Sequence, residues 1–545
     1  MKANGKWKIS AGILAAVLLL SACGQSGGSS TGESTPASST PADNSAAESS
    51  TPDDVVSEYG DTGGLTLPLV DKEVKLTWSL GTVADNINDL LIPKEICKRT
   101  GIDLEIQAYP YGSYGEKVKV IMGSGNLPDI VSSPGSMSEI NVYGGQGAFA
   151  PINQYLDYLP NFKSIYVDDE ENNWYLYSYS NDNGDVFLWP VYGLNRDVNH
   201  GWLYRADIFE KNGIEPWTDT ESFYQALKKL KEAYPDSYPL ASKNQAGWFN
   251  AIAKYWGASG DRYYDEADGT WKYGATSDGY KEMLDFLKKC YNEGLLDPEF
   301  LTDTQDSWSA KMTTDKAFVT YDWIGRLDLF TNQMKDANPD YDLRYGYPIG
   351  STGKQFSLDK ISVYGVCVSA ASKNVIPALQ LLDYLCSPSG SELFTIGIEG
   401  VNFEWDENGK PVYPELADEE LIDIKLLETK YGMWAEPMYL RPDHRSVYYN
   451  FSEREQEAQD ICNNITGYNP LDPMLKLTDA ETEIYNNFYL SVDTALKEFS
   501  AKYVTDASYG DAQWEEWKTK VAGLGEADAL KALNDAQARY DAEKK

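Results

Sequence analysis

The hydrophobic and polar positions of this chain alternate between a period of two and a helical period from Val74 onward. Stretches rich in β-branched and aromatic residues have the period of two, and apolar residues three or four apart lie between them. Strand, helix, strand, helix and short strand are predicted at Val74–Leu80, Asn88–Thr100, Ile102–Tyr109, Tyr114–Met122 and Asp129–Ser132. The first two strands begin about 28 residues apart, and this order predicts a parallel α/β sheet.

A second α/β region follows, and apolar residues line one face of each of its helices. Thr218 to Glu221 fit a capping box that begins one helix, and another helix should end near Gly294. Two strands and a further helix are predicted at Lys316–Tyr321, Ile361–Ser369 and Ala378–Cys386. The tail from about Thr478 is polar and helical, and its expected apolar anchors are Trp514, Trp517, Leu524 and Leu530.

Residues 1–22 have the pattern of a secretory signal peptide. Lys2, Lys6 and Lys8 precede an apolar run, Ile9–Leu20, which is too short for a comfortable transmembrane span. The sequence Leu20-Ser21-Ala22-Cys23 then resembles the bacterial lipobox, in which the cysteine is diacylated and becomes the first mature residue. We therefore expect lipid chains on Cys23 to anchor the protein to the outer face of the membrane without spanning it.

Residues 23–54 are expected to form a disordered tether. From Gly24 to about Asp54 the chain consists almost wholly of Ser, Thr, Gly, Pro and Ala with a few acids, a composition that cannot bury a core. About thirty such residues reach roughly 30 Å as a root-mean-square distance. That reach suits a domain that must move above a membrane and meet a partner there.

The length and the charge of the chain restrict the architectures and partners that are possible. A chain of 545 residues exceeds what one hydrophobic core usually serves, so at least two lobes are expected. Its 84 acidic and 47 basic residues give a formal charge of −37. Such a field repels nucleic acid and anionic lipid surfaces, so we expect no nucleic-acid partner.

The sequence offers little for catalysis or metal binding. His200 and His444 are the only histidines, too few for a histidine triad or a multi-histidine metal site. Asn181–Asp185 has calcium-like letters, but the first and twelfth positions of that loop lack carboxylates, so a hairpin turn is predicted. The acidic run Asp168–Glu171 is interpreted as a solvated loop rather than a glycosidase pair. We therefore predict no catalytic residue, no metal and no cofactor.

Several short motifs occur in a specific order along the folded part. They are Asn126–Val131, Gly147–Ile152, Leu203–Ile214, and Gly397–Gly400 followed by Asn408–Pro411. Through these motifs the chain resembles the family 1 extracellular solute-binding proteins, and most closely the lipoproteins of Gram-positive ABC sugar importers. The motifs span most of residues 70–415, whereas about 130 residues at the C-terminus match only loosely.

The resemblance implies a type II periplasmic-binding-protein-like fold. Each of two α/β lobes would be a mainly parallel sheet flanked by helices, and the C-terminal part would be helical. Chain crossings are expected near Trp189-Pro190 and near Tyr345–Ile349. Lobe one would comprise residues 70–189 and 350–400, and lobe two residues 190–349 and 401–545.

The resemblance also implies the function. The protein would capture a carbohydrate, in particular an oligosaccharide, between the lobes by aromatic stacking and hydrogen bonds. It would deliver this ligand to the transmembrane permease subunits of an ABC importer, acting as a lipid-anchored monomer on the extracellular face of a Gram-positive cell membrane and not as an enzyme.

In open α/β sheets, ligands bind beyond the carboxyl ends of strands, so the candidate ligand residues lie in loops. Sugars stack their C–H faces on aromatic rings and hydrogen-bond to Asp, Asn and Arg through their hydroxyl groups. Strand ends supply Thr82, Asp85, Asn86, Ser133, Asp322, Trp323 and Arg326, the first crossing supplies Tyr192 and Asn195, and two further aromatic candidates are Trp248 and Trp434.

Other interpretations of these residues remain open. Each candidate could instead serve ordinary packing, and Trp323 could fill a lobe core beside a surface pair of Asp322 and Arg326. At the level of the whole protein, the alternatives are a surface-anchored glycosidase or lyase, a structural lipoprotein, and a binding protein for a peptide or another polar solute.

Overall fold

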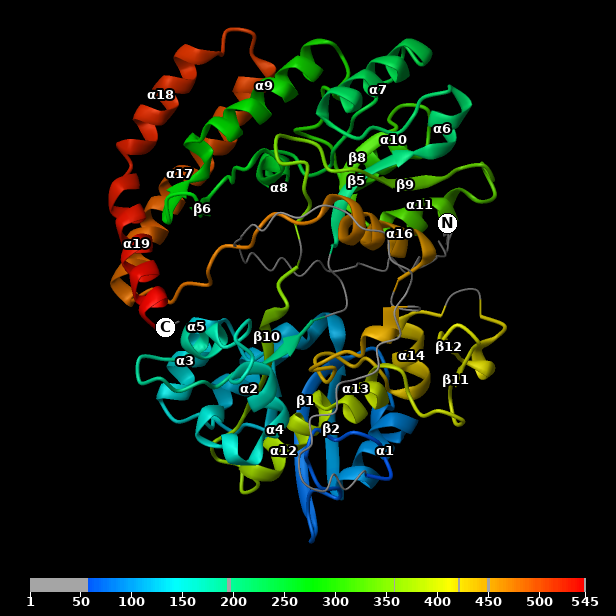
Figure 1. Ribbon diagram of the computed structural model, residues 1–545, viewed down its shortest axis with the longest axis vertical. Coiled ribbons are helices and arrows are strands. Elements are labelled where there is room, and N and C mark those ends of the chain that lie inside the picture. Colours follow the sequence, from blue (N-terminus) through cyan, green and yellow to red (C-terminus); the bar gives the residue numbers. More distant parts are fainter. Residues whose placement is uncertain (1–56, 194–197, 357, 420–421, 448–450, 544–545) are drawn as a thin grey trace, which may run out of the picture.

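The computed structural model describes residues 57–193, 198–356, 358–419, 422–447 and 451–543. In these ranges the helices and strands form two lobes, one around a five-stranded sheet and one around a three-stranded sheet (Figure 1). No helix in the described ranges combines the length and the apolar character needed to cross a membrane. The predicted signal peptide, the tether with Cys23, and Asn195 lie outside the described residues.

The sheet of the first lobe has the strand order β2-β1-β3-β10-β4. Its strands are β1 (Val74–Thr82), β2 (Ile102–Pro110), β3 (Ile130–Ser132), β10 (Ile361–Val368) and β4 (Trp189–Tyr192). β1 is parallel to β2 and β3, whereas β10 is antiparallel to both β3 and β4. The four strands predicted for this lobe are confirmed, and their ends differ by no more than a residue or two.

Helices cover this first sheet as the apolar spacing predicts. The main ones are α1 (Leu91–Thr100), α2 (Tyr114–Ser124) and α12 (Val375–Cys386). α1 buries Ile92 and Ile96 and ends at Gly101, whose φ of 74° lies in the left-handed region that favours glycine. This helix begins later than predicted because Asn88 belongs to a separate turn of 3-10 helix.

The sheet of the second lobe has the order β8-β5-β9, built from β8 (Val319–Trp323), β5 (His200–Arg205) and β9 (Leu343–Gly346). β5 is antiparallel to both neighbours, so the three strands form an antiparallel sheet and not the mainly parallel one that was predicted. Leu240 extends it by parallel bridges to Val319 and Leu296. The physical reason is that β5 begins at the edge where the chain crosses from the first lobe, whereas β8 ends at that edge, so the two strands run in opposite directions.

Two amphipathic helices pack in the second lobe, α7 (Thr220–Ala233) and α9 (Asp278–Asn292). The capping box of α7 lies one residue later than predicted. The Asp219 carboxylate accepts from the backbone N–H of Ser222 (2.7 Å), and the Ser222 hydroxyl accepts from the backbone N–H of Asp219 (3.1 Å). Two backbone N–H groups that lack a partner within the helix, those of Asp219 and Ser222, are thereby hydrogen-bonded.

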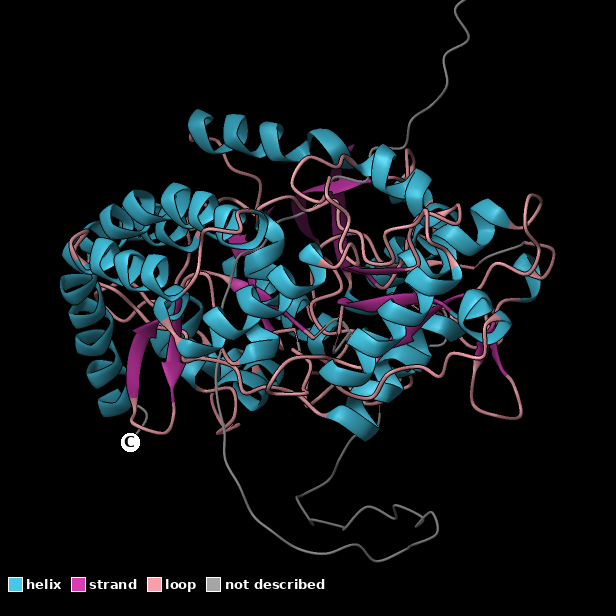
Figure 2. Cartoon of the chain, turned by 90° about the horizontal axis from the view of Figure 1, so that it is seen from above, coloured by secondary structure: helices cyan, strands magenta, loops and turns pink. Residues whose placement is uncertain are grey.

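The C-terminal part is helical, as predicted, with α17 (Asp479–Thr505), α18 (Asp511–Ala522) and α19 (Glu526–Glu543). These helices gather at one side of the molecule beside the hairpin of β6 (Arg262–Asp265) and β7 (Thr270–Tyr273) (Figure 2). Trp271 fixes this packing, because its indole N–H donates to Gln537 (2.9 Å) and its backbone N–H donates to Asn534 (2.9 Å).

The boundary between the lobes differs from the prediction in the C-terminal half. Buried residues from Phe403 to Leu440 pack into the core of the first lobe and not into the second. They include α14 (Ile424–Tyr431), whose Leu427 is fully buried against that core. This segment stays with the first lobe because α14 is held against the end of β1, where the Thr82 hydroxyl donates to Glu428. The chain is back in the second lobe at α16 (Glu453–Ile461), where Arg454 pairs with Asp342 and Ala458 is buried.

Candidate binding site

The two sheets face each other at the edges where the chain crosses between them. β10 is antiparallel to β3 and β4, so β4 ends at the same edge as the carboxyl ends of β1, β2 and β3. The chain leaves that edge after Tyr192 and enters β5 at His200. The Gly193 N–H donates to the Lys360 carbonyl (2.5 Å), so the outgoing and returning crossings run side by side. We call the edge at which β1, β2, β3 and β4 end the first-sheet edge. The edge at which β5 begins and β8 ends is the second-sheet edge.

Asp322 organises the second-sheet edge. Its side chain is 1% exposed and accepts from two cations: Lys243 Nζ lies 3.0 Å from Oδ1 and 2.8 Å from Oδ2, and Arg326 Nε donates to Oδ1 at 3.0 Å. The backbone N–H of Trp323 also donates to Oδ1 (2.8 Å). Burial lowers the pKa of the Lys243 ammonium, and the Asp322 carboxylate opposes that shift. Asp322 therefore positions Lys243 and Arg326 and is itself covered.

Trp323 is the last residue of β8, which is two residues longer at this end than the predicted strand. Its side chain is partly exposed, and its ring centroid lies 3.9 Å from that of His200, with 44° between the planes. Trp323 does not belong to any of the buried clusters among the described residues. The structure thus brings Asp322, Trp323 and Arg326 together at one strand end, where the pattern placed them.

Lys243 was missed by the sequence analysis. It follows the bridge residue Leu240, which runs parallel to β8, so its position is again just beyond the carboxyl end of a strand-like segment. Besides Asp322 it donates to the side-chain oxygen of Gln305 (3.0 Å). The strand-end rule would have selected Lys243 if the segment around Leu240 had been recognised as part of the sheet.

At the first-sheet edge, Thr82 has a structural partner. Its hydroxyl donates to Glu428 Oε1 (2.7 Å), which also accepts from the backbone N–H of Val83 (3.1 Å). Glu428 is 1% exposed, and its Oε2 lies 3.0 Å from Lys425 Nζ. Thr82 is itself buried, so it secures the carboxyl end of β1 to α14.

Tyr111 and Glu436 form a second pair at this edge that the sequence analysis missed. The Tyr111 hydroxyl donates to Glu436 Oε2 (2.8 Å), and Lys425 Nζ lies 4.9 Å from the centre of the Tyr111 ring. Burial raises the pKa of the Glu436 carboxyl, although the Tyr111 hydrogen bond opposes the shift. Tyr111 directly follows β2, so it shares an edge with Thr82. The partly exposed pair can offer both a hydroxyl and a carboxyl group.

The remaining candidates at the first-sheet edge differ in exposure. Asp85 and Asn86 are exposed, and Ser133 and Tyr192 are partly exposed. Ser133 follows β3 with a φ of 42°, and its N–H donates to the Gly365 carbonyl (2.8 Å). The Tyr192 N–H donates to the Leu440 carbonyl (2.7 Å), which ties the start of the first crossing to a buried segment of the first lobe. These four residues stay predicted ligand residues.

Two aromatic candidates lie in cores. Trp248 is not in a loop but in α8 (Gly247–Ala253), and it is 0% exposed in an aromatic cluster with Trp202 and Phe300. Trp434 is 2% exposed, and its indole N–H donates to the Thr395 carbonyl (3.0 Å). The expectation that either presents a ring face to a ligand is therefore corrected, because packing covers both rings in this structure.

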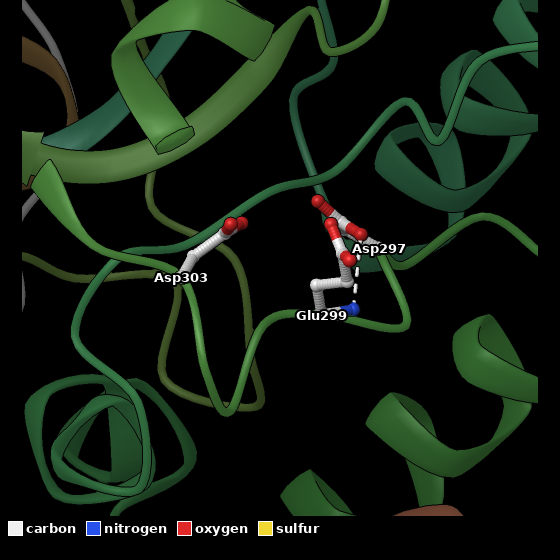
Figure 3. A group of neighbouring side chains, drawn as sticks. All are labelled: Asp297, Glu299 and Asp303. Carbon is white, nitrogen blue, oxygen red and sulfur yellow. Dashed lines mark hydrogen bonds between the residues drawn. The ribbon is translucent and has the colours of Figure 1, made fainter. Parts of the chain in front are cut away.

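A cluster of three carboxylates, Asp297, Glu299 and Asp303, lies in the second lobe (Figure 3). Its centre is taken by an ammonium group: Lys311 Nζ lies 2.6 Å from Asp297, 2.8 Å from Glu299 and 2.8 Å from Asp303. Burial alone would lower the pKa of Lys311, but the three hydrogen-bonded carboxylates raise it overall. The lysine holds the three carboxylates together, and we interpret this cluster as structural.

The sequence matches the family described as bacterial extracellular solute-binding protein over residues 93–399. Lipoprotein LipO of Bacillus subtilis is 25% identical over 338 residues, which cover 57% of this chain and 63% of LipO. The fructooligosaccharide ABC transporter substrate-binding protein FusA of Streptococcus pneumoniae is 21% identical over 528 residues, which cover 88% of this chain and 93% of FusA.

Solved structures show the same fold. An HMO-binding solute-binding protein associated with an ABC transporter, from Bifidobacterium longum infantis, superposes with a TM-score of 0.65 at 16% sequence identity. The superposition covers 87% of this chain and 100% of that protein. The two lobes, the facing sheet edges and the helical C-terminal part thus form a type II solute-binding fold.

Proposed function

The chain belongs to the bacterial extracellular solute-binding proteins, and from this premise we propose that it captures an oligosaccharide between its lobes and delivers it to the permease of an ABC importer. The curated relative FusA is named for fructooligosaccharide transport, and the superposed Bifidobacterium protein is described as HMO-binding. The chemistry of the facing edges fits a ligand of this class.

Two partly exposed features carry this proposal, Trp323 at the second-sheet edge and the Tyr111–Glu436 pair at the first-sheet edge. Trp323 is a partly exposed ring at a strand end, where its free face can stack on the C–H face of a sugar. Tyr111 and Glu436 supply hydroxyl and carboxyl groups for hydrogen bonds to sugar hydroxyls from the other side. An oligosaccharide needs both kinds of contact, because each ring has apolar faces and a polar rim.

We further propose that the protein is a monomer held on the extracellular face of a Gram-positive membrane by lipid chains on Cys23. The basic and apolar leader before Leu20-Ser21-Ala22-Cys23 supports this proposal, as does the relative named lipoprotein LipO. In a Cys23→Ala variant the protein should move from the membrane fraction to the medium. Membrane retention of this variant, with no lipid on the wild-type N-terminus by mass spectrometry, would refute the anchor.

The proposed role is binding without catalysis, since solute-binding proteins return their ligand unchanged. Turnover of a bound glycan above background, lost on substitution of a single Asp or Glu, would instead place the protein among enzymes.

Calorimetric titration of the purified protein against a panel of neutral and acidic oligosaccharides and of peptides tests the function. We expect saturable binding of at least one oligosaccharide and none of the peptides. Peptide binding without carbohydrate binding would overturn the proposal.

A further inference from the structure

Charges at the second-sheet edge are cancelled within the protein. The cations Lys243 and Arg326 share the carboxylate of Asp322, and the three side chains are 9%, 20% and 1% exposed. A second carboxylate adjoins the same turn, because a Cβ atom placed on Gly325 would lie 3.5 Å from Glu455 Oε1. Two positive and two negative groups therefore lie together at the strand end where Trp323 is exposed.

This arrangement bears on which sugars can bind. Proteins recognise a ligand carboxylate with a guanidinium or ammonium group whose charge is not already neutralised. At this edge a uronate would meet cations that are already paired with Asp322, and it would also meet the negative charge of Asp322 and Glu455. A hydroxyl group carries no charge and can accept or donate beside such a network without this repulsion.

The charged side chains around Tyr111 at the first-sheet edge are no more favourable to an acidic sugar. Lys425 is paired with Glu428 at 3.0 Å, and Glu436 adds a further carboxyl group. Ionised, Glu436 repels a uronate; protonated, it contributes no positive charge. At longer range the formal charge of −37 opposes the approach of any polyanion at low ionic strength.

Building on the proposed function, we infer that the ligand is a neutral oligosaccharide and that Asp322 is a specificity-determining residue. Asp322 excludes uronate-containing glycans because it neutralises Lys243 and Arg326, which would otherwise form a carboxylate-binding pair. It acts through these two side chains as a positioning residue and does not touch the sugar.

The first experiment compares neutral and acidic probes on the wild-type protein. The neutral set is 1-kestose, maltotetraose, cellotetraose, xylotetraose and fully methyl-esterified tetragalacturonate, and the acidic set is tetragalacturonate and tetraguluronate. We expect the best neutral probe to bind at least about tenfold more tightly than either acidic probe. Its affinity should change by less than about twofold between low and physiological salt, since no net charge is neutralised on binding.

The second experiment uses Asp322→Asn, with Lys243→Met as the matched control. Asp322→Asn frees both cations, so it should gain affinity for the acidic probes by about tenfold or more, and added salt should weaken this new binding. Lys243→Met leaves Arg326 paired with Asp322 and should gain nothing. A thermal melt of each variant confirms folding, and if Asp322→Asn does not fold, the wild-type comparison still decides whether the ligand is neutral.

The outcomes distinguish failure of this inference from failure of the proposed function on which it rests. Tighter binding of an acidic than of a neutral probe by the wild-type protein would overturn the inference while the carbohydrate-binding function stands. A folded Asp322→Asn variant with no gain in acidic binding would overturn the role of Asp322. Failure of both sets to bind, together with peptide binding, would overturn the proposed function and the inference with it.

Discussion

Two buried carboxylates, Asp322 in the second lobe and Asp383 in the first, are stabilised by different means. In the second lobe, Asp322 lies between the ammonium of Lys243 and the guanidinium of Arg326. In the first lobe, Asp383 is 0% exposed and accepts from the N–H groups of Asn161 and Phe162. Asp322 is thus balanced by opposite charge, whereas Asp383 relies on neutral donors.

This difference has consequences for each lobe. Neutral donors leave the cost of burying a charge largely uncompensated, and burial raises the pKa of Asp383 to about 6 although its N–H donors oppose the shift. At Asp322, by contrast, the two cations are balanced only while the carboxylate is present. We therefore expect the first lobe to respond to pH at Asp383, and the second lobe to respond to the removal of Asp322.

Removing Asp322 should have the largest effect. Asp322→Ala leaves Lys243, 9% exposed, without its counter-charge, which should lower the free energy of unfolding by about 3–5 kcal/mol in denaturant titration. The double variant Asp322→Ala with Lys243→Met should recover part of this loss. A loss below about 1 kcal/mol in the single variant would show that the charge pair does not stabilise the lobe.

The pH dependence at Asp383 should be next in size. Its pKa is higher in the folded state than in the unfolded chain, so its contribution to stability is fully present below about pH 4 and is lost as the pH rises to about 6. Relative to Asp383→Asn, the wild-type protein should lose about 2–3 kcal/mol across this window. Unfolding curves of both proteins from pH 4 to pH 7 measure this difference, and parallel curves would contradict the raised pKa.

Trp323→Ala should weaken binding of the oligosaccharide by about 1–3 kcal/mol and leave the melting temperature nearly unchanged. The matched control is Trp405→Ala, which removes another partly exposed indole, in β11 (Glu404–Trp405) of the first lobe. This control should keep its affinity. A large drop in melting temperature with unchanged affinity for Trp323→Ala would assign Trp323 to packing.

Thr82→Val should have the smallest effect and should fall on stability alone. The substitution keeps the shape of the side chain but removes the hydroxyl that donates to the buried Glu428, at a cost of about 1–2 kcal/mol. Titration of the same variant should give the wild-type affinity. Weaker binding with unchanged stability would show that Thr82 contacts the ligand, as the sequence predicts.

Local features of this fold were predictable, and distant pairings were not. Four of the five strands of the first-lobe sheet and the Asp322–Arg326 pair were predictable because they depend on alternation and on a spacing of four residues. The partners Lys243 and Glu436 were missed, since they lie 79 residues from Asp322 and 325 residues from Tyr111. The burial of Trp248 was also unpredictable, because a tryptophan at a helix start suits a core as well as a binding surface.

Small-angle scattering with and without a saturating oligosaccharide tests the central claim most directly. The ligand should contact both sheet edges at once, and only a closed arrangement of the lobes allows this. We predict a smaller radius of gyration with the ligand and the same closure in Thr82→Val. An unchanged radius of gyration, with an oligosaccharide that titration shows to be bound, would contradict capture between the lobes.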